Sequence, residues 1–378
     1  MDAVDAALAR FPAEGRVELV AARAHPLPEA LRAELRALAG GTEGELERLA
    51  RADRALGELL AEAALALLAE AGVGPAAVAA IGSHGQTVRH LPGVASVQIG
   101  DPARVAERTG ITVVADFRRR DLAAGGQGAP LAPAFHAAVL RRPGRERAVL
   151  NLGGIANLTV LPADPRAPVL GFDTGPANTL LDAWARRHLG RPYDAGGRWA
   201  AGGRVHPGLL ERLLADPYFA APPPKSTGPE HFGLGWLEEA LARTPGAAGL
   251  APRDVQATLC ELTAATVAQA VEAHAPKAEE LLLCGGGVAN AELLRRLAER
   301  LPGRRVLPTD AAGVPARWME ALLFAWLARQ TLAGRPGNLP SVTGARRAVV
   351  LGAVHPAVRP GAAGAGGRGG RLPQAPSR

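Results

Sequence analysis

Cysteine is almost absent from this chain of 378 residues, which contains only Cys260 and Cys284. Both lie in apolar surroundings without the spacing of a metal site or a disulfide framework, which favours buried thiols in a reducing compartment. Long apolar runs are also lacking, since charged residues or glycine interrupt each one well before the roughly 18 residues that a membrane helix needs. The acidic start at residues 1–5 lacks the basic region of a signal peptide. We therefore expect a globular cytoplasmic protein that binds no membrane.

Lysine is nearly missing too, although the net charge is +7 and the isoelectric point is near 10.4. The Gly-rich tail at 357–378 carries four of these positive charges on Arg359, Arg368, Arg371 and Arg378, and it contains no acidic residue. No recognition-helix pattern or aromatic-and-basic strand pattern accompanies the charge, so we expect no nucleic-acid partner. The composition of the tail predicts a disordered appendage.

The run Gly-Phe-Asp-Thr-Gly-Pro-Ala-Asn at 171–178 is the most informative stretch that is present. It follows an apolar, strand-like segment and precedes a helical one, so a carboxylate, Asp173, is placed at the mouth of a strand. A catalytic base or a metal-bridging acid is typical of such a position. Two alternatives are a helix N-cap and one half of an aspartic protease dyad. The similar Ser-Thr-Gly at 226–228 has no carboxylate, which argues against the protease.

The first part of the chain is expected to combine helices with strands that end in polar loops. Residues 25–73 have apolar residues at helical spacing and predict two or three helices. Strands near 78–82, 96–99 and 111–115 each run into a polar loop, and these loops carry His84, Asp101 and Asp116. Ligand sites of open α/β sheets lie at such carboxyl ends.

A second set of elements follows a Gly-rich break at 123–130. Two strands around Gly153-Gly154 predict a hairpin, and helices are expected at 254–274, 291–301 and 317–333. These patterns suggest four parts: a first domain at 1–140, a second domain at 141–334, a return segment to the first domain at 335–356, and the tail at 357–378.

Glycine-rich turns in this second set are suited to phosphate groups. No Walker A motif is present, and no Gly-x-Gly-x-x-Gly follows a strand. Instead, the hairpin turn at 151–154 bares successive backbone N–H groups, and Gly285-Gly286-Gly287 opens a helix, where an anion or a nucleobase can approach closely. Glycines that only pack a helix onto a strand are the alternative for each turn taken alone.

The order of these motifs resembles that of the actin, Hsp70 and sugar-kinase superfamily. More narrowly, about residues 2 to 356 are similar to the anhydro-N-acetylmuramic acid kinase family. The resemblance rests on His-Gly-Gln-Thr-Val-Arg-His at 84–90, Gln-Ile-Gly-Asp at 98–101, 116–121 leading to 125–131, 151–159, 172–178 with 182–184, Lys-Ser-Thr-Gly at 225–228, 285–290, Glu320 and 342–345.

The resemblance implies a two-domain α/β fold of the actin-like ATPase (sugar kinase) type, with an active-site cleft between the domains. It also implies an ATP-dependent kinase of peptidoglycan recycling that uses Mg²⁺ and acts in the cytoplasm as a homodimer. In that family, water attacks C1 of 1,6-anhydro-N-acetylmuramic acid while O6 takes the γ-phosphoryl group. The product is N-acetylmuramic acid 6-phosphate.

Roles for individual residues follow from the same resemblance. Asp173 matches the family's catalytic aspartate, which takes a proton from the water. Arg118 or Arg120 would stabilise charge on the transferring phosphoryl group, and Glu320 would lie near the sugar. The metal ligands are left unassigned. The expected substrate-binding residues are His84, Gln86, Asp101 and Asn178, and the expected nucleotide-binding residues are Asn151, Gly153, Gly154, Gly285, Gly286, Gly287 and Asn290.

One departure from the family's pattern concerns the start of the chain. The family opens with a strand and the loop Gly-x-Met-Ser-Gly-Thr-Ser-x-Asp-Gly-x-Asp, and this chain begins inside that motif, with Asp2 on its first Asp and Asp5 on its last. We therefore expect the first strand and first phosphate loop to be missing, which leaves the activity of this exact chain open. A start codon placed too late is one explanation, and a catalytically silent muramyl-sugar-binding protein is another. Another sugar kinase of the same superfamily is a third alternative.

Overall fold

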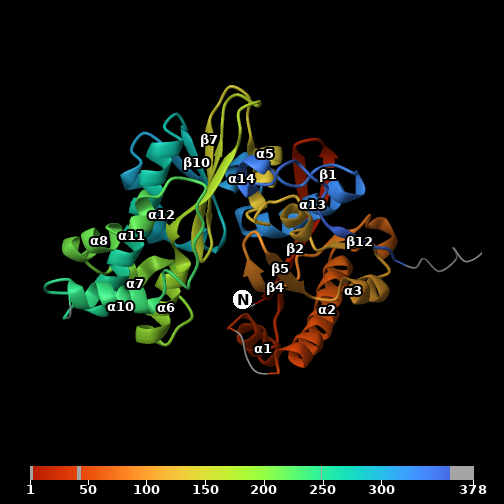
Figure 1. Ribbon diagram of the computed structural model, residues 1–378, viewed down its shortest axis with the longest axis horizontal. Coiled ribbons are helices and arrows are strands. Elements are labelled where there is room, and N and C mark those ends of the chain that lie inside the picture. The colour runs from red at the N-terminus through yellow and green to blue at the C-terminus, as the bar shows by residue number, and fades with distance from the viewer. Residues whose placement is uncertain (1–2, 41–43, 248, 358–378) are drawn as a thin grey trace, which may run out of the picture.

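A computed structural model describes residues 3–40, 44–247 and 249–357 of the chain (Figure 1). The expected disordered tail lies outside the described residues, apart from residue 357. Within the described ranges, none of the helices combines the length and the apolar character that spanning a membrane requires.

The second half of the chain is built on one five-stranded sheet with the order β11-β10-β7-β8-β9. Strands β7, β8 and β9 form an antiparallel meander, while β10 pairs in parallel with β7 on one side and with β11 on the other. The hairpin expected around Gly153-Gly154 is confirmed as β7–β8. The bounds of the five strands are β7 Arg147–Leu152, β8 Ile155–Leu161, β9 Leu170–Pro176, β10 Glu280–Cys284 and β11 Arg305–Pro308.

Both faces of this sheet are buried, because successive side chains of a strand point to opposite faces. In β7, Leu150 and Leu152 join the hydrophobic cluster under one helical layer, whereas Val149 joins the cluster under the other. Figure 1 shows the helices of the first layer gathered on one side of the molecule. The first layer contains α6 Asn178–Leu189, α11 Pro252–His274 and α12 Ala291–Arg300, and the second contains α5 Ala132–Leu140 and α13 Met319–Leu332.

Shorter helices complete the second half. They are α7 Arg198–Ala201, α8 Pro207–Leu214, α9 Pro217–Ala220 and α10 Leu234–Arg243, with short 3-10 helices at Ala195–Gly197, Gly286–Ala289, Thr309–Ala312 and Ala316–Trp318.

The first half contains three small sheets instead of one. A three-stranded sheet has the order β12-β6-β3, and two separate hairpins are formed by β1 with β2 and by β4 with β5. The pairing of β12 with β6 is antiparallel and brings the segment after α13 back to this half. The bounds are β1 Ala3–Ala13, β2 Arg16–Pro26, β3 Ile81–Gly82, β4 Gln86–Leu91, β5 Ala95–Ile99, β6 Val113–Ala115 and β12 Ala353–His355. The helices are α1 Glu29–Gly40, α2 Glu45–Glu70, α3 Pro102–Thr109, α4 Arg119–Ala123 and α14 Pro340–Thr343, with a 3-10 helix at Pro75–Ala77.

The α/β class expected from the sequence is confirmed, and α1 and α2 are the helices expected within 25–73. Two expectations about strands were wrong. Residues 86–91, where no strand was expected, form β4, and β5 pairs with β4 and not with β3 or β6. The three expected strand ends therefore do not belong to one sheet edge. The β1–β2 hairpin was not anticipated, because its many alanines give no clear alternation of apolar and polar residues.

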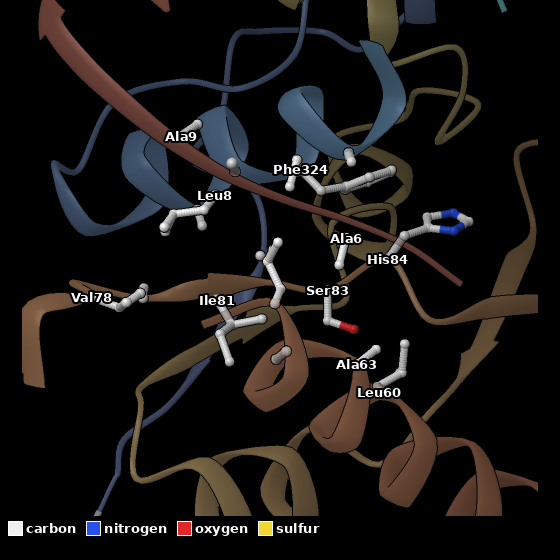
Figure 2. A pocket seen from close by; sticks show the side chains of 18 of the residues that line it. Ala6, Leu8, Ala9, Leu60, Ala63, Val78, Ile81, Ser83, His84 and Phe324 are labelled. Atoms are coloured by element: carbon white, nitrogen blue, oxygen red, sulfur yellow. The ribbon is translucent and has the colours of Figure 1, made fainter. Parts of the chain in front are cut away.

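A cavity of about 1070 Å³ lies in the first half. Strand β1 and the segment 77–86 border it, and α2 and α13 contribute much of the rest of its wall (Figure 2). Among the described residues, β1 pairs only with β2 and β3 pairs only with β6, so these two strands belong to separate sheets. Ala6 and Leu8 of β1, which line this cavity, are only partly buried.

His136 links α5 to β8 and should make stability depend on acid pH. Its Nδ1 lies 3.0 Å from the Thr159 hydroxyl, and burial lowers its pKa from 6.5 to about 4. The unfolded chain therefore binds a proton between these pH values that the folded chain does not. We expect the contribution of His136 to the free energy of unfolding to be fully present above pH 6.5 and to fall by about 3 kcal/mol as the pH drops to 4.

The measurement is urea unfolding between pH 4 and 7.5, compared with the variant His136→Gln. Glutamine keeps a polar group that can reach Thr159 but does not titrate, so its unfolding curve should depend less on pH. An identical pH dependence in the two proteins would contradict the assignment to His136.

Candidate active site

Asp173 lies inside β9, opposite Asn157 of β8, at a break in the regular register. Ala156 pairs with Gly175 and Asn157 pairs with Asp173, so Thr174 is an extra residue on β9, which makes a β-bulge. Bulges bend a strand and redirect its side chains, and they are frequent beside active sites. Gly175 has φ +148° and permits this backbone.

Asp173 lies within its strand and not at the strand's mouth, because β9 continues to Pro176. The alternative of a helix N-cap is excluded, because Ala177 occupies that position before α6. The sequence placed the carboxylate near the strand's end correctly but could not reveal the bulge, which depends on the pairing with β8.

Both oxygens of the Asp173 carboxylate accept hydrogen bonds. Asn157 Nδ2 donates to Oδ1 at 2.8 Å, and the backbone N–H of Thr227 donates to Oδ2 at 3.0 Å. Burial raises the pKa of Asp173 above its ordinary value of 3.8, and these two hydrogen bonds oppose that effect. A carboxylate that is half-shielded, fixed in orientation and somewhat more basic than usual is suited to accept a proton.

The backbone of Asp173 is held by the segment 218–227. Its N–H donates to Lys225 O at 3.1 Å, and its carbonyl oxygen accepts from Tyr218 Oη at 2.8 Å. The Lys225 ammonium donates to the carbonyl oxygens of Tyr218 and Phe219 and lies over the Tyr218 ring. Lys225 thus fixes a loop, a use of its point charge that the sequence alone did not show.

The two glycine-rich turns meet in the structure. Gly285 has φ +83°, and a Cβ there would lie 2.4 Å from Asn151 Oδ1. A Cβ on Gly287 would lie 2.6 Å from Leu152 Cβ, whereas a Cβ on Gly286 would have no neighbour within 4 Å. Gly285 and Gly287 therefore pack against β7, and Gly286 faces open space where a ligand can approach the bare backbone.

The hairpin turn also caps a helix. The carbonyl oxygens of Gly153 and Gly154 accept from the backbone N–H groups of residues 177–179 at 3.0–3.1 Å. These contacts satisfy donors at the N-terminus of α6. An anion is thus not expected to bind at the start of α6.

The asparagines expected near the ligands lie on the same side as the glycine turns. Asn178 Nδ2 donates to Leu152 O at 3.0 Å, so Asn178 borders the glycine turns and not the residues around His84. The Asn151 side chain lies beside Gly285. Asn290 caps α12 by accepting from the backbone N–H of Leu293 at 3.0 Å. Its side chain therefore has a structural use.

Arg118 and His84 of the first half come together with Glu320 of α13. Arg118 donates to His84 Nε2 at 3.1 Å and to Gly128 O at 3.3 Å. His84 Nδ1 lies 3.1 Å from Gly85 O, and the ring packs on Phe324 at 4.7 Å between centroids. Burial, and then the Arg118 charge, lower the pKa of His84 to about 4, so it is neutral and can accept from Arg118.

Glu320 is the acid that faces Arg118. Glu320 lines the cavity and is exposed there. Desolvation by the surrounding protein raises the pKa of its carboxyl above 4.5, and the charge of Arg118 opposes this rise. Burial lowers the pKa of Arg118, and Glu320 raises it. Arg118 is thus a fixed cation at the inner wall of the site.

The remaining expected residues have local contacts. Arg120 is exposed on α4, unlike Arg118. Gln86 Nε2 donates to the carbonyl oxygen of Thr87 at 3.1 Å. Asp101 is the N-cap of α3, with one oxygen accepting from Arg104 N and the other from Arg104 Nε. These contacts of Asp101 structure the loop and the start of α3.

The large cavity reaches only one end of this constellation. Ser83, His84 and Glu320 line it, but Asp173 and the glycine turns do not. Figure 2 shows His84 beside Phe324 at one end and apolar side chains such as Ile81, Leu60 and Leu8 along the rest. The chemistry of the site is therefore centred outside the apolar body of the cavity.

Three residues near Asp173 were not singled out from the sequence: Asn157, Thr227 and Tyr218. Asn157 and Thr227 lay within runs that carry the family resemblance, which is the signal that could have found them. Tyr218 belongs to an irregular stretch and had no such signal.

Comparison with known proteins gives a consistent result. The family model described as anhydro-N-acetylmuramic acid kinase matches residues 1–357. The anhydro-N-acetylmuramic acid kinase of Xanthomonas campestris pv. campestris (strain 8004) is 55% identical over 362 residues, covering 94% of each chain. Those of Bordetella petrii and Coxiella burnetii (strain Dugway 5J108-111) are 55% and 50% identical, again over 94% of each chain.

Solved structures are more distant. Component A of (R)-2-hydroxyglutaryl-CoA dehydratase from Acidaminococcus fermentans is 12% identical, with 84% of this chain and 95% of that chain covered and a TM-score of 0.41. A ROK hexokinase from Thermus thermophilus is 17% identical, with 86% and 100% covered and a TM-score of 0.32. Likeness at this level does not extend to function.

Proposed function

The chain belongs to the anhydro-N-acetylmuramic acid kinase family, and on that premise we propose how its residues carry out the reaction. The protein is an ATP-dependent kinase of peptidoglycan recycling. It opens the anhydro ring of 1,6-anhydro-N-acetylmuramic acid by hydrolysis and phosphorylates O6, giving N-acetylmuramic acid 6-phosphate. The match to the family model and to relatives at 50–55% identity supports this kinase over the silent sugar-binding protein and over another sugar kinase of the superfamily.

Asp173 is the general base. A water molecule attacks C1, the C1–O6 bond breaks, and the proton of the water passes to the Asp173 carboxylate while O6 takes the γ-phosphoryl group from ATP. The observation that carries this role is the fixed carboxylate, with one hydrogen bond on each oxygen from Asn157 Nδ2 and Thr227 N. Each oxygen retains capacity to accept from a water. General-base catalysis of this kind contributes about 10²- to 10⁴-fold.

Arg118, and not Arg120, is the cation that stabilises charge on the transferring group. His84 and Gly128 O hold its guanidinium in one place, so it needs no rearrangement when charge develops. Arg120 is exposed and has no comparable support. Glu320 is the counter-charge of Arg118 and lies where the sugar would bind, and Gln86 is a further candidate for a contact with the substrate.

Replacing Arg118 with lysine tests this assignment. A single ammonium cannot satisfy both His84 Nε2 and Gly128 O and still face the substrate. We expect kcat to fall by about 10²- to 10³-fold, as when one preorganised donor is removed from an active site. Arg120→Lys should cost far less. Steady-state kinetics of the two variants measures this difference in kcat. An equal loss of kcat in both variants would contradict the assignment of Arg118.

The glycine turns are proposed to receive ATP. Gly286 presents open backbone, and Gly285 and Gly287 on either side of it in sequence pack against Asn151 and Leu152. Gly153 and Gly154 of the adjoining hairpin turn are assigned to the same site. Asn290 would act there only indirectly, by capping α12. Asn178 belongs on this nucleotide side by its contact with Leu152 O.

Mg²⁺ is proposed as the companion of ATP, where it neutralises phosphate charge. Within residues 3–40, 44–247 and 249–357, three or more His, Cys, Asp or Glu side chains are nowhere grouped to hold a metal ion. Mg²⁺ bound mainly by phosphate oxygens and water suits such a protein, because this ion keeps several waters and needs few carboxylates. We further propose that the protein acts in the cytoplasm as a homodimer, on the basis of its family alone.

The experiment that tests the function is ADP release by the purified chain with ATP and Mg²⁺, with and without 1,6-anhydro-N-acetylmuramic acid. We expect release only when the sugar is present, together with a sugar product that carries phosphate on O6 by phosphorus NMR. ADP release that ignores the sugar, or none at all, would count against the proposal for this chain.

A further inference from the structure

All four hydrogen-bonding groups of Asp173 have partners within the protein. The backbone N–H and carbonyl are bound by Lys225 O and Tyr218 Oη, and the carboxylate oxygens by Thr227 N and Asn157 Nδ2. Three of the four partners come from the segment 218–227, and the fourth comes from the neighbouring strand β8. A side chain bound in this way has almost no freedom to rotate.

The segment 218–227 is itself anchored from behind. Phe219 stacks on the fully buried Phe232 at 5.4 Å between ring centroids, and Phe232 meets the Trp236 ring edge-on at 4.9 Å. Asp216 accepts from Tyr218 N and from Trp236 Nε1, both at 2.9 Å. These contacts hold the Thr227 N–H and the Tyr218 hydroxyl as parts of a packed unit.

Asn157 is fixed on the opposite side. The bulge at Thr174 sets Asp173 directly across from Asn157 in the β8–β9 pair. Because an ionised carboxylate only accepts hydrogen bonds, the amide of Asn157 must present its NH₂ group to Oδ1. Asn157 thus stabilises the ionised form of the Asp173 carboxylate.

We propose that Asn157 and the Thr227 N–H are positioning groups, which hold the Asp173 carboxylate in one orientation toward the water that it deprotonates. This inference rests on the proposed function of Asp173 as the base. Asn157 acts through Asp173 and need not touch the substrate. A hydrogen bond to the charged form of a carboxylate lowers its pKa, so losing one should raise it.

Two ionisable side chains of the segment 218–227, those of Tyr218 and Lys225, lie around Asp173. Tyr218 stays protonated, because burial and then the Asp173 charge raise its pKa. Burial lowers the pKa of Lys225, whose ammonium is turned to the Tyr218 and Phe219 carbonyl oxygens. Neither group hydrogen-bonds to the carboxylate oxygens. A shift of the acid limb in an Asn157 variant can therefore be attributed to a change in the pKa of Asp173.

The test compares Asn157→Leu and Asn157→Asp with the unaltered chain by steady-state kinetics between pH 4 and 9. Leucine has a similar size without a donor, so we expect kcat to fall by about 10- to 100-fold through lost orientation, while KM for ATP is kept. The acid limb of kcat should move to higher pH by about one unit, since the base then loses its charge earlier on acidification. Aspartate should move the limb further, because two adjacent carboxylates share a proton.

Gln330→Leu serves as the control, since it also removes an amide hydrogen bond, to Pro336 O, but on α13 away from Asp173. It should leave kcat within about twofold and the acid limb in place. Thermal melts of all variants verify folding, and Asn157→Asp changes only one atom should the leucine variant fail to fold.

An acid limb that stays in place in both Asn157 variants overturns the inference, as does a kcat within about twofold of the unaltered chain. A different result would show that Asp173 is not the general base. In that case Asp173→Asn would itself keep full activity, whatever the Asn157 variants do.

Discussion

Asp173→Asn is expected to lower kcat by about 10²- to 10⁴-fold, the usual contribution of a general base, with KM for ATP little changed. Asparagine has the same shape but cannot take a proton from water. It can also keep both contacts of the original carboxylate. Its oxygen can accept from Thr227 N, and its NH₂ can donate to Asn157 once the Asn157 amide turns over.

The loss of kcat in Asp173→Asn would therefore reflect the missing base and not a disrupted site. Circular dichroism and thermal melts should match those of the unaltered chain, and sugar-dependent ADP release should nearly vanish. In the unaltered chain, activity should fall on acidification through a pKa above the ordinary 3.8, because burial raises the pKa of Asp173 and the base must be ionised to act. A kcat that stays within about tenfold after the substitution would assign the proton transfer to another group.

Asp121→Ala is expected to produce a large loss of stability. Asp121 is fully buried. One of its oxygens accepts from Asn338 Nδ2 at 2.6 Å and Thr343 Oγ1 at 2.7 Å, and the other accepts from Gly128 N at 2.8 Å. Alanine would leave the Gly128 N–H without its partner, and Asn338 Nδ2 and Thr343 Oγ1 with only their longer contacts of 3.4 Å to Arg347 O and Leu339 O. We expect about 3–5 kcal/mol less free energy of unfolding.

Urea unfolding at pH 7 measures this loss, with Asp121→Asn as the matched variant. Asparagine fills the same space and can accept from Asn338 and Thr343, but its NH₂ group would then face the Gly128 N–H, donor against donor. Its loss should therefore lie between those of the unaltered chain and the alanine variant. A loss under about 1 kcal/mol in Asp121→Ala would show that water replaces the missing carboxylate.

The Asp121 contacts also connect stability with activity. Gly128 donates its N–H to Asp121 and offers its carbonyl oxygen to Arg118. Loosening the loop at 125–128 would therefore release one of the two contacts that fix the Arg118 guanidinium. We expect any folded Asp121 variant to lose activity along with stability.

Much of the second half could be predicted from its sequence. The hairpin at Gly153-Gly154, the strand before Gly285 and the helix α11 follow from local patterns of apolar residues and turns, and these patterns act over a few neighbouring residues. The first half was harder. Short strands such as β3, and the alanine-rich β1 and β2, have no strong alternation, and β4 was hidden in a polar run.

The site divides in the same way. The sequence by itself determined which chemical groups are available: the Asp173 carboxylate in a glycine-flanked strand, the arginines after β6, and two turns of bare backbone around 153–154 and 285–287. These depend on residue type and on local backbone freedom.

Only the tertiary structure decided how these groups act together. It placed Thr227 and Tyr218 on Asp173 across more than 40 residues of chain, separated Arg118 from Arg120 by burial, and turned Asp101 and Asn290 to helix capping. The physical reason is that hydrogen-bond partners and burial arise from packing between distant segments, which no local pattern of residues encodes.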